Sequence, residues 1–158
     1  GSLRDAYRAI HEVIRQAVVA LGLPDAALAG APDAPLGLGA GACFAGAVGG
    51  EVVHGGRKLA GSAQLRAGHA LLQHGSLLLE DDQSLVRTLA GSTEPPAETT
   101  LTDALGRPVP FEDAAQAVLT SARTSWDGSW IPADADALVA RSAGHAPLFR
   151  DPYWTWRR

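Results

Sequence analysis

A pair of adjacent glycines constrains the fold of this chain more than any other local feature. Gly55 and Gly56 stand between two strand-like segments, residues 51–54 and 57–66. Two-residue hairpin turns require positive φ angles, which glycine adopts without steric cost. The pair therefore predicts a β-hairpin built from these two segments.

The length of the turn also fixes the register of the predicted hairpin. A two-residue loop pairs His54 with Arg57 and Val53 with Lys58. Since side chains alternate along a strand, one face of the second strand is expected to be polar and the other to pack. The polar face consists of Lys58, Ala60, Ser62, Gln64 and Arg66. The packing face consists of Leu59, Gly61, Ala63 and Leu65.

The segments around the hairpin predict an α+β fold. Residues 71–79 are expected to form a third strand, and residues 3–21 a helix that begins at a capping box of Ser2 and Asp5. Residues 24–41, rich in Pro, Gly and Ala, predict a loop that leads to Cys43. Further helices are expected over residues 82–90, 99–106, 111–124 and 133–143. We therefore predict an antiparallel hairpin meander covered by helices.

Length and composition exclude several classes of function for this chain. A chain of 158 residues is expected to form one domain, residues 1–158, with a core that needs no disulfide or metal. The net charge of −4 argues against a nucleic-acid partner, and no apolar run reaches the ~20 residues of a membrane helix. A single cysteine fits a reducing compartment, so we expect a cytoplasmic protein. His54, His69 and His74 are too loosely spaced to predict a metal site.

Three residues of the central segment are candidates for chemistry, each with a structural alternative. Cys43 is either a nucleophile or a small buried residue. Lys58 either polarises a carbonyl or phosphate oxygen or only solubilises an edge hairpin. His74, in an apolar strand, is either a hydrogen-bonded core histidine or a residue that orients others in a site.

Three sequence runs carry a resemblance to a known family. They are Cys43-Phe44, the run Gly56-Arg57-Lys58-Leu59-Ala60-Gly61-Ser62-Ala63-Gln64, and Gln73-His74-Gly75-Ser76. In order and spacing they resemble the lipoate–protein ligase and octanoyltransferase family, which shares a fold with the catalytic domain of biotin–protein ligase. The resemblance implies that this chain is part of such a catalytic domain.

The resemblance also implies an activity and a set of site residues. Cys43 takes an octanoyl or lipoyl group as a thioester and passes it to a lysine of a carrier domain, while Lys58 contacts the acyl carbonyl. The residues implied in substrate binding are Gly61, Ser62, Ala63, Gln64, His74 and Gly75. Gln64 and the Gln73-His74 pair are more typical of the transferase branch. An acceptor lysine must lose a proton before it attacks, and His74 is a candidate base.

The implied partners follow from this chemistry. An acyl carrier protein donates the acyl group, and a lipoyl carrier domain or a glycine-cleavage H-like protein accepts it. No cofactor or metal is required in this branch. The alternative is an ATP-dependent lipoate–protein ligase, which would need ATP and Mg²⁺ and in which Cys43 is incidental.

Two departures from the family pattern bear on these expectations. Residues 45–50 are Ala-Gly-Ala-Val-Gly-Gly, where the family usually has a Pro-Ser-aromatic pattern. The chain also lacks the basic, glycine-rich Arg-Arg-x-x-Gly-Gly stretch of the family's earlier half. It therefore resembles the C-terminal portion of the catalytic domain with the N-terminal half absent. A non-catalytic or split subunit that binds a partner half or second subunit is the remaining alternative.

Overall fold

A computed structural model describes residues 2–30, 44, 46–80 and 83–155 of the chain. These residues fall into two compact units, Gly1–Trp126 and Asp127–Arg158, which are considered separately. The expectation of one domain over residues 1–158 stays a prediction.

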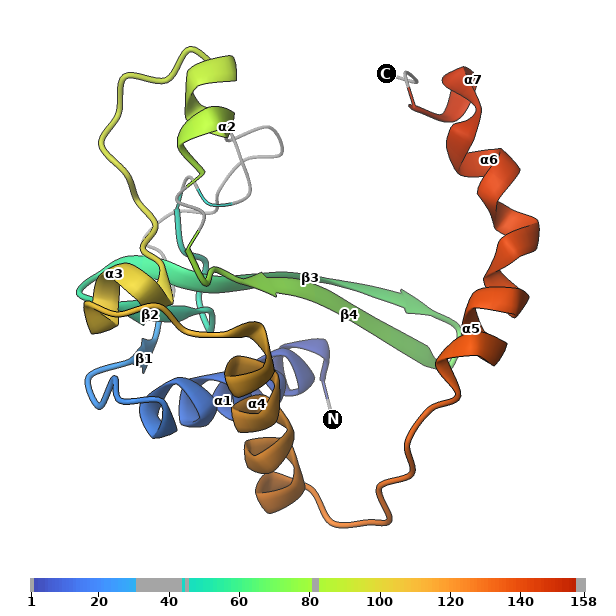
Figure 1. Cartoon of the computed structure of the whole chain (residues 1–158), viewed down its shortest axis with the longest axis horizontal. Coiled ribbons are helices and arrows are strands. Elements are labelled where there is room, and N and C mark those ends of the chain that lie inside the picture. The colour runs from blue at the N-terminus through green and yellow to red at the C-terminus, as the bar shows by residue number, and fades with distance from the viewer. Residues whose placement is uncertain (1, 31–43, 45, 81–82, 156–158) are drawn as a thin grey trace. The chain divides into compact units, whose positions relative to one another are not determined.

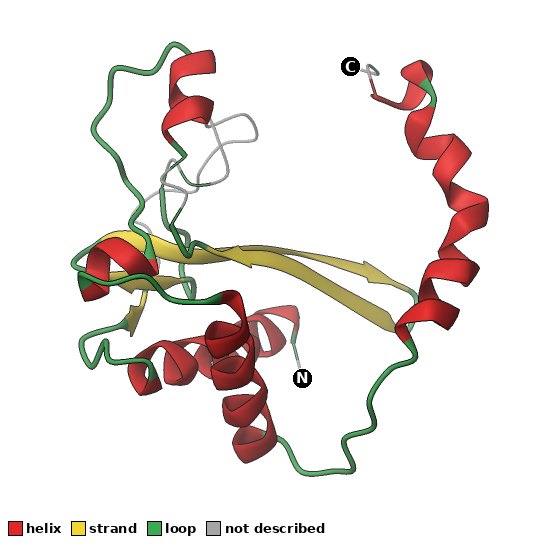
Figure 2. Cartoon of the chain, viewed as in Figure 1, coloured by secondary structure: helices red, strands yellow, loops and turns green. Residues whose placement is uncertain are grey.

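The first unit combines helices with one open sheet (Figures 1 and 2). Its elements are α1 (Leu3–Ala20), β1 (Ala27–Leu28), β2 (Val52–His54), β3 (Arg57–Ala67), β4 (Ala70–Leu77), α2 (Ser84–Leu89), α3 (Leu101–Leu105) and α4 (Phe111–Ser125). The strands lie in the order β1-β2-β3-β4, and every neighbouring pair is antiparallel. The predicted α+β class is therefore confirmed.

The edge strand β1 is a correction to the predicted loop over residues 24–41. Ala27 and Leu28 pair with Val53 and Val52 of β2. A strand of two residues is too short to show the alternation by which strands are predicted from sequence. The part of the predicted loop from residue 31 to residue 41 lies outside the described residues.

The glycine turn has the predicted geometry. Gly55 and Gly56 have φ angles of +56° and +76°, as a hairpin turn of this kind requires. His54 pairs with Arg57 and Val53 pairs with Lys58, as predicted.

One step beyond the turn, a β-bulge interrupts the regular alternation. Val53 of β2 pairs with Lys58, but Val52 pairs with Ala60, so Leu59 is an extra residue on β3. A bulge of this kind changes which side chains share a face of the strand. The predicted polar face, which placed Lys58 in line with Ser62, is therefore wrong at its first position.

Helix α1 begins as predicted and supplies one side of the core. The Ser2 hydroxyl accepts a hydrogen bond from the Asp5 amide at 3.1 Å, and the Asp5 carboxylate accepts one from the Ser2 amide at 3.0 Å. The helix ends just before Gly22, whose positive φ of +117° is a conformation that glycine adopts more readily than other residues. The helix packs against α4 and against β1, β2 and β3.

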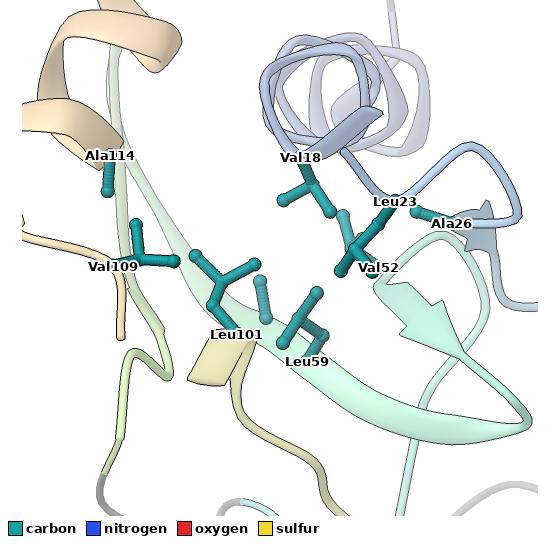
Figure 3. Packing of buried hydrophobic residues seen from close by; sticks show 9 residues of the cluster. Val18, Leu23, Ala26, Val52, Leu59, Leu101, Val109 and Ala114 are labelled. Carbon is teal, nitrogen blue, oxygen red and sulfur yellow. The ribbon is translucent and has the colours of Figure 1, made fainter. Parts of the chain in front are cut away.

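The core lies between α1, the bulged part of the hairpin and the helices α3 and α4. Leu59 and Leu101 are fully buried at its centre. Figure 3 shows these two side chains among the other members of the cluster, which are Val18, Leu23, Ala26, Val52, Ala60, Val109 and Ala114. Burial of one leucine side chain stabilises a fold by about 1.5–3 kcal/mol, so this cluster anchors β3 and holds the bulge in place.

The second unit consists of consecutive short helices. They are α5 (Ala135–Ser142), the 3₁₀ helix η1 (Ala143–His145), α6 (Ala146–Arg150) and α7 (Pro152–Thr155). Phe149 and Trp154 pack edge to face, with ring centroids 4.7 Å apart. Helix α5 confirms the helix predicted over residues 133–143. Within the described residues of the whole chain, no helix combines the length and apolar character needed to cross a membrane.

Candidate functional site

A buried ion pair joins β3 to the residue that precedes β2. The Lys58 ammonium lies 2.9 Å from Glu51 Oε2, and the two side chains are 6% and 2% exposed. Removing two charges from water costs several kcal/mol per ion, unless close pairing and further hydrogen bonds compensate for it. The surroundings of the pair therefore decide whether it is stable.

The Glu51 carboxylate has donors from three parts of the chain. Besides Lys58, the Tyr7 hydroxyl of α1 donates to Oε1 at 3.2 Å, and the Val48 amide donates to Oε2 at 2.8 Å. An ionised carboxylate only accepts hydrogen bonds, and its two oxygens are both used here. The carboxylate is therefore held in one position.

The lysine side of the pair contacts the segment just before Glu51. The Lys58 ammonium donates to the Gly46 carbonyl at 3.3 Å and lies 5.0 Å from the centre of the Phe44 ring. A cation over an aromatic ring is attracted by the negative face of the ring. Phe44 directly follows Cys43 in the sequence. The candidate nucleophile Cys43 itself lies outside the described residues.

The absence of a side chain at Gly61 makes room for the ion pair. A Cβ at this position would lie 2.3 Å from Lys58 Cε and 2.7 Å from Glu51 Oε1. Because real Cβ contacts are not this short, the lysine and the glutamate occupy the space that any other residue would fill. Lys58 thus lies against Gly61, which the regular alternation had placed on the opposite face.

A second polar cluster lies between α1 and the β3–β4 hairpin. The Ser62 hydroxyl is 3.2 Å from His11 Nε2 and accepts a hydrogen bond from the Gln73 amide at 2.9 Å. The Gln64 side-chain amide lies 2.7 Å from Gln73 Oε1. His11 and Ser62 are thus joined to the two glutamines that the sequence singles out.

The partners of His11 indicate its protonation state. Its Nδ1 lies 3.1 Å from the Tyr7 carbonyl, which can only accept, so we assign the proton to Nδ1. Nε2 then accepts from the Ser62 hydroxyl. Burial lowers the pKa of His11 below 6.5, and the charge of Lys58 lowers it further, against the opposing influence of Tyr7 and Glu51. His11 is therefore neutral at pH 7.

Tyr7 connects the two clusters. Its hydroxyl lies within hydrogen-bond distance of both Glu51 Oε1 and the Ser62 carbonyl, at 3.2 and 2.9 Å. Its ring packs against that of His11 at 4.3 Å. Burial raises the pKa of Tyr7 to about 12, and the negative charge of Glu51 acts in the same direction. Tyr7 is therefore a neutral donor throughout the physiological range.

The structure brings together only some of the residues singled out from sequence. Lys58, Gly61, Ser62 and Gln64 lie in or beside the two clusters. Gly75 also belongs with them.

The place of Gly75 follows from the strand pairing. It lies opposite Ser62, and a Cβ there would come within 2.5 Å of Ser62 Cβ. Its lack of a side chain therefore allows the two strands to approach closely beside the second cluster.

Ala63 and His74 lie on the face of the hairpin opposite to Ser62 and Gln73. They pair with each other across β3 and β4 and are both exposed. Residues adjacent to Ser62 and Gln73 in the strands point away from them, because side chains alternate. The core-histidine interpretation of His74 is therefore wrong. Its suggested role as a base stays a prediction.

Sequence reasoning missed Tyr7, His11 and Glu51 as members of the site. Tyr7 and His11 are four residues apart on a predicted helix, so a shared polar patch was visible in the sequence. A second signal lies in the basic residues. The chain has 13 lysines and arginines, and Lys58 is the one lysine among them.

Within the described ranges, no group of three or more His, Cys, Asp or Glu residues could hold a metal ion.

Comparison with known proteins identifies the family to which the chain belongs. The family model of the lipoyl protein ligase A/B catalytic domain matches residues 1–123. The chain is 39% identical over 132 residues to the octanoyltransferase LipM of Symbiobacterium thermophilum, an alignment that covers 74% of this chain and 48% of that protein. The chain therefore spans about half the length of this relative.

Two solved structures share the fold at low sequence identity. A putative lipoate protein ligase from T. acidophilum with bound lipoic acid has a TM-score of 0.67 at 16% identity, covering 98% of this chain and 58% of that one. A lipoate-protein ligase A bound with ATP has a TM-score of 0.61 at 16% identity, covering 89% and 55%. The resemblance seen in the sequence is thus confirmed, and the chain belongs to the lipoyl protein ligase A/B catalytic domain family.

Proposed function

We propose that this chain forms part of a cysteine-dependent acyltransferase that moves an octanoyl or lipoyl group onto a lysine of a carrier domain. The observation that carries the proposal is the 39% identity to an octanoyltransferase over 132 residues. The contacts of Lys58 with Phe44 and Gly46 support it, because they tie the candidate oxyanion-binding lysine to the segment that follows Cys43.

The proposed reaction has two acyl-transfer steps. The Cys43 thiolate attacks the carbonyl of the donor thioester, the new sulfur–carbon bond forms, and the donor thiol leaves with a proton. The amine of the acceptor lysine then attacks the Cys43 thioester, an amide bond forms, and the cysteine is regenerated as the amine loses a proton. Each step is an ordinary exchange at an acyl carbon, so no oxidant, metal or nucleotide is consumed.

Lys58 is assigned the role of stabilising the negative charge that develops on the carbonyl oxygen in both steps. Its cationic ammonium is held by short contacts before any substrate binds, which is the condition for electrostatic catalysis. Loss of one such donor typically costs about 10²–10³-fold in kcat, or about 3–4 kcal/mol.

The proposed partners follow from this chemistry. The donor is an acyl carrier protein, and the acceptor is a lipoyl carrier domain or a glycine-cleavage H-like protein. No cofactor is proposed. His74, exposed on the hairpin, remains the candidate base for the acceptor amine.

The test uses the complete gene product with octanoyl carrier protein as donor. We expect mass spectrometry to find an octanoyl adduct on Cys43, and Cys43→Ser to abolish both the adduct and transfer to the acceptor. An enzyme that keeps its activity in Cys43→Ser and releases pyrophosphate from ATP would instead be a ligase. A protein that binds a partner but transfers nothing would be a non-catalytic subunit.

A further inference from the structure

We propose that Glu51 is a positioning residue that sets the place of the Lys58 ammonium and of the chain segment that follows Cys43. The catalytic consequence of this inference depends on the proposed acyl transfer. The geometric part does not, and can be tested on its own.

The first argument concerns how tightly the carboxylate is held. Its oxygens accept from Tyr7 at 3.2 Å, from Val48 at 2.8 Å and from Lys58 at 2.9 Å. These donors come from α1, from the segment before β2 and from β3, so the carboxylate cannot move without breaking contacts to all three. At 2% side-chain exposure, it also has little access to water.

The second argument concerns what Glu51 holds. Lysine has a flexible four-carbon stem, and its ammonium takes a fixed place only where partners define one. Here Glu51 holds the ammonium, and the ammonium in turn contacts the Phe44 ring and the Gly46 carbonyl. Glu51 also binds the Val48 amide directly. One carboxylate therefore organises the described part of residues 44–48 from both ends.

The third argument is energetic. Replacing a buried ion pair by well-packed apolar residues is often neutral or stabilising, so stability alone is a weak reason for a protein to keep one. Twelve of the 13 lysines and arginines of this chain are arginines, yet it has a lysine at this buried position. A lysine whose place is fixed by a carboxylate suits a site in which a compact point charge must meet a developing oxyanion.

The first experiment measures the accessibility of Lys58 in the 158-residue chain. Lys58 is its one side-chain amine, so acetylation with acetic anhydride reports on it directly, with the N-terminal amine as internal reference. We expect Glu51→Gln to raise the initial acetylation rate of Lys58 about tenfold, the change that about 1.4 kcal/mol of lost coupling produces. Tyr7→Phe removes one of the donors to Glu51 and should raise the rate by a smaller factor.

Glu12→Gln is the matched control for this experiment. Glu12 pairs with Arg15 on the surface of α1, so the same change of charge occurs away from the cluster. Its Lys58 acetylation rate should equal that of the wild type. Circular dichroism is used to check that each variant is folded. If Glu51→Gln does not fold, the acetylation rates of Lys58 in Glu51→Asp and Tyr7→Phe test the inference in its place. Wild-type acetylation rates in the folded Glu51 and Tyr7 variants would overturn the inference.

The second experiment measures acyl transfer by the complete gene product in a double-mutant cycle. Glu51→Gln should lower kcat about tenfold with little change in KM, and Glu51→Asp should recover part of the loss. In a Lys58→Ala background, Glu51→Gln should have a much smaller effect on kcat than in the wild type, because the contact of Glu51 with Lys58 is already lost and only those with Val48 and Tyr7 remain. Additive losses would mean a general structural role and would reject the positioning role.

The two experiments separate failure of the inference from failure of the proposed function. If Cys43→Ser leaves transfer unchanged but Glu51→Gln still exposes Lys58, the positioning role stands and the acyltransferase mechanism falls. If Cys43 is essential but Glu51→Gln changes neither acetylation nor kcat, the positioning role falls alone.

Discussion

Substitution of Gly61 by alanine tests the packing around the buried ion pair most directly. The added Cβ would lie 2.3 Å from Lys58 Cε and 2.7 Å from Lys58 Nζ and Glu51 Oε1. Favourable carbon contacts begin at about 3.5 Å, so the lysine has to move by roughly 1 Å or more. The flexible side chain can make that movement, but only by leaving the place in which Glu51 holds it.

The expected change in the free energy of unfolding of Gly61→Ala is the balance of two opposing contributions. Overfilling a packed site costs about 1–3 kcal/mol, whereas replacing glycine by alanine stabilises the fold by about 0.4–1 kcal/mol through the unfolded chain. We expect a net loss of roughly 1–2 kcal/mol in the free energy of unfolding. For a chain of this length that lowers Tm by about 2–8 °C. Displacement of the Lys58 ammonium should lower kcat for acyl transfer about 10²-fold.

The assays are thermal unfolding of the chain and octanoyl transfer by the complete gene product. Gly30→Ala is the matched control, since no atom of the described residues lies within 4 Å of a Cβ at that position and its φ is not positive. It should leave Tm and kcat close to the wild-type values. If Gly61→Ala behaves like Gly30→Ala, with kcat within about threefold of wild type, the ion pair does not need the space at Gly61 and the reasoning is wrong.

Three further predictions concern the second cluster. Gly75→Ala would place a Cβ 2.6 Å from the Gly61 carbonyl, a backbone atom that cannot swing aside, so chemical denaturation should show a loss of about 1–3 kcal/mol. Because burial lowers the pKa of His11 below 6.5, the unfolded state binds its proton more readily. The free energy of unfolding should therefore fall as the pH drops below 6.5, and His11→Gln should flatten that fall; an unchanged slope would refute the buried neutral state. Burial raises the pKa of Tyr7 to about 12, so an ultraviolet titration should contain a step near that pH that disappears in Tyr7→Phe.

The elements that sequence reasoning found are those determined by neighbouring residues. The turn at Gly55 and Gly56, the register next to it and the capping box at Ser2 each depend on contacts only a few positions apart. Their residue types therefore carry the information by themselves. The same holds for α4, whose apolar residues recur at helical spacing.

The site could be predicted only in part, because it is assembled across the sequence. Tyr7 and Glu51 are 44 positions apart, and nothing local to either residue indicates that they meet. The bulge at Leu59 has no local signature either, yet it determines that Lys58 lies against Gly61. The family resemblance singled out Lys58 as a candidate, whereas the carboxylate that holds it emerged only from the three-dimensional contacts.

The burial of Lys58 has a consequence for unwanted self-modification. An enzyme that carries a reactive thioester and delivers it to lysine amines is at risk of acylating its own surface. Lys58 is the one lysine of this chain, and its side chain is 6% exposed with its ammonium held by Glu51. The other twelve of its 13 lysines and arginines are arginines, whose guanidinium groups are poor acyl acceptors. Under the proposed acyl transfer, this chain thus offers no exposed lysine that could compete with the acceptor.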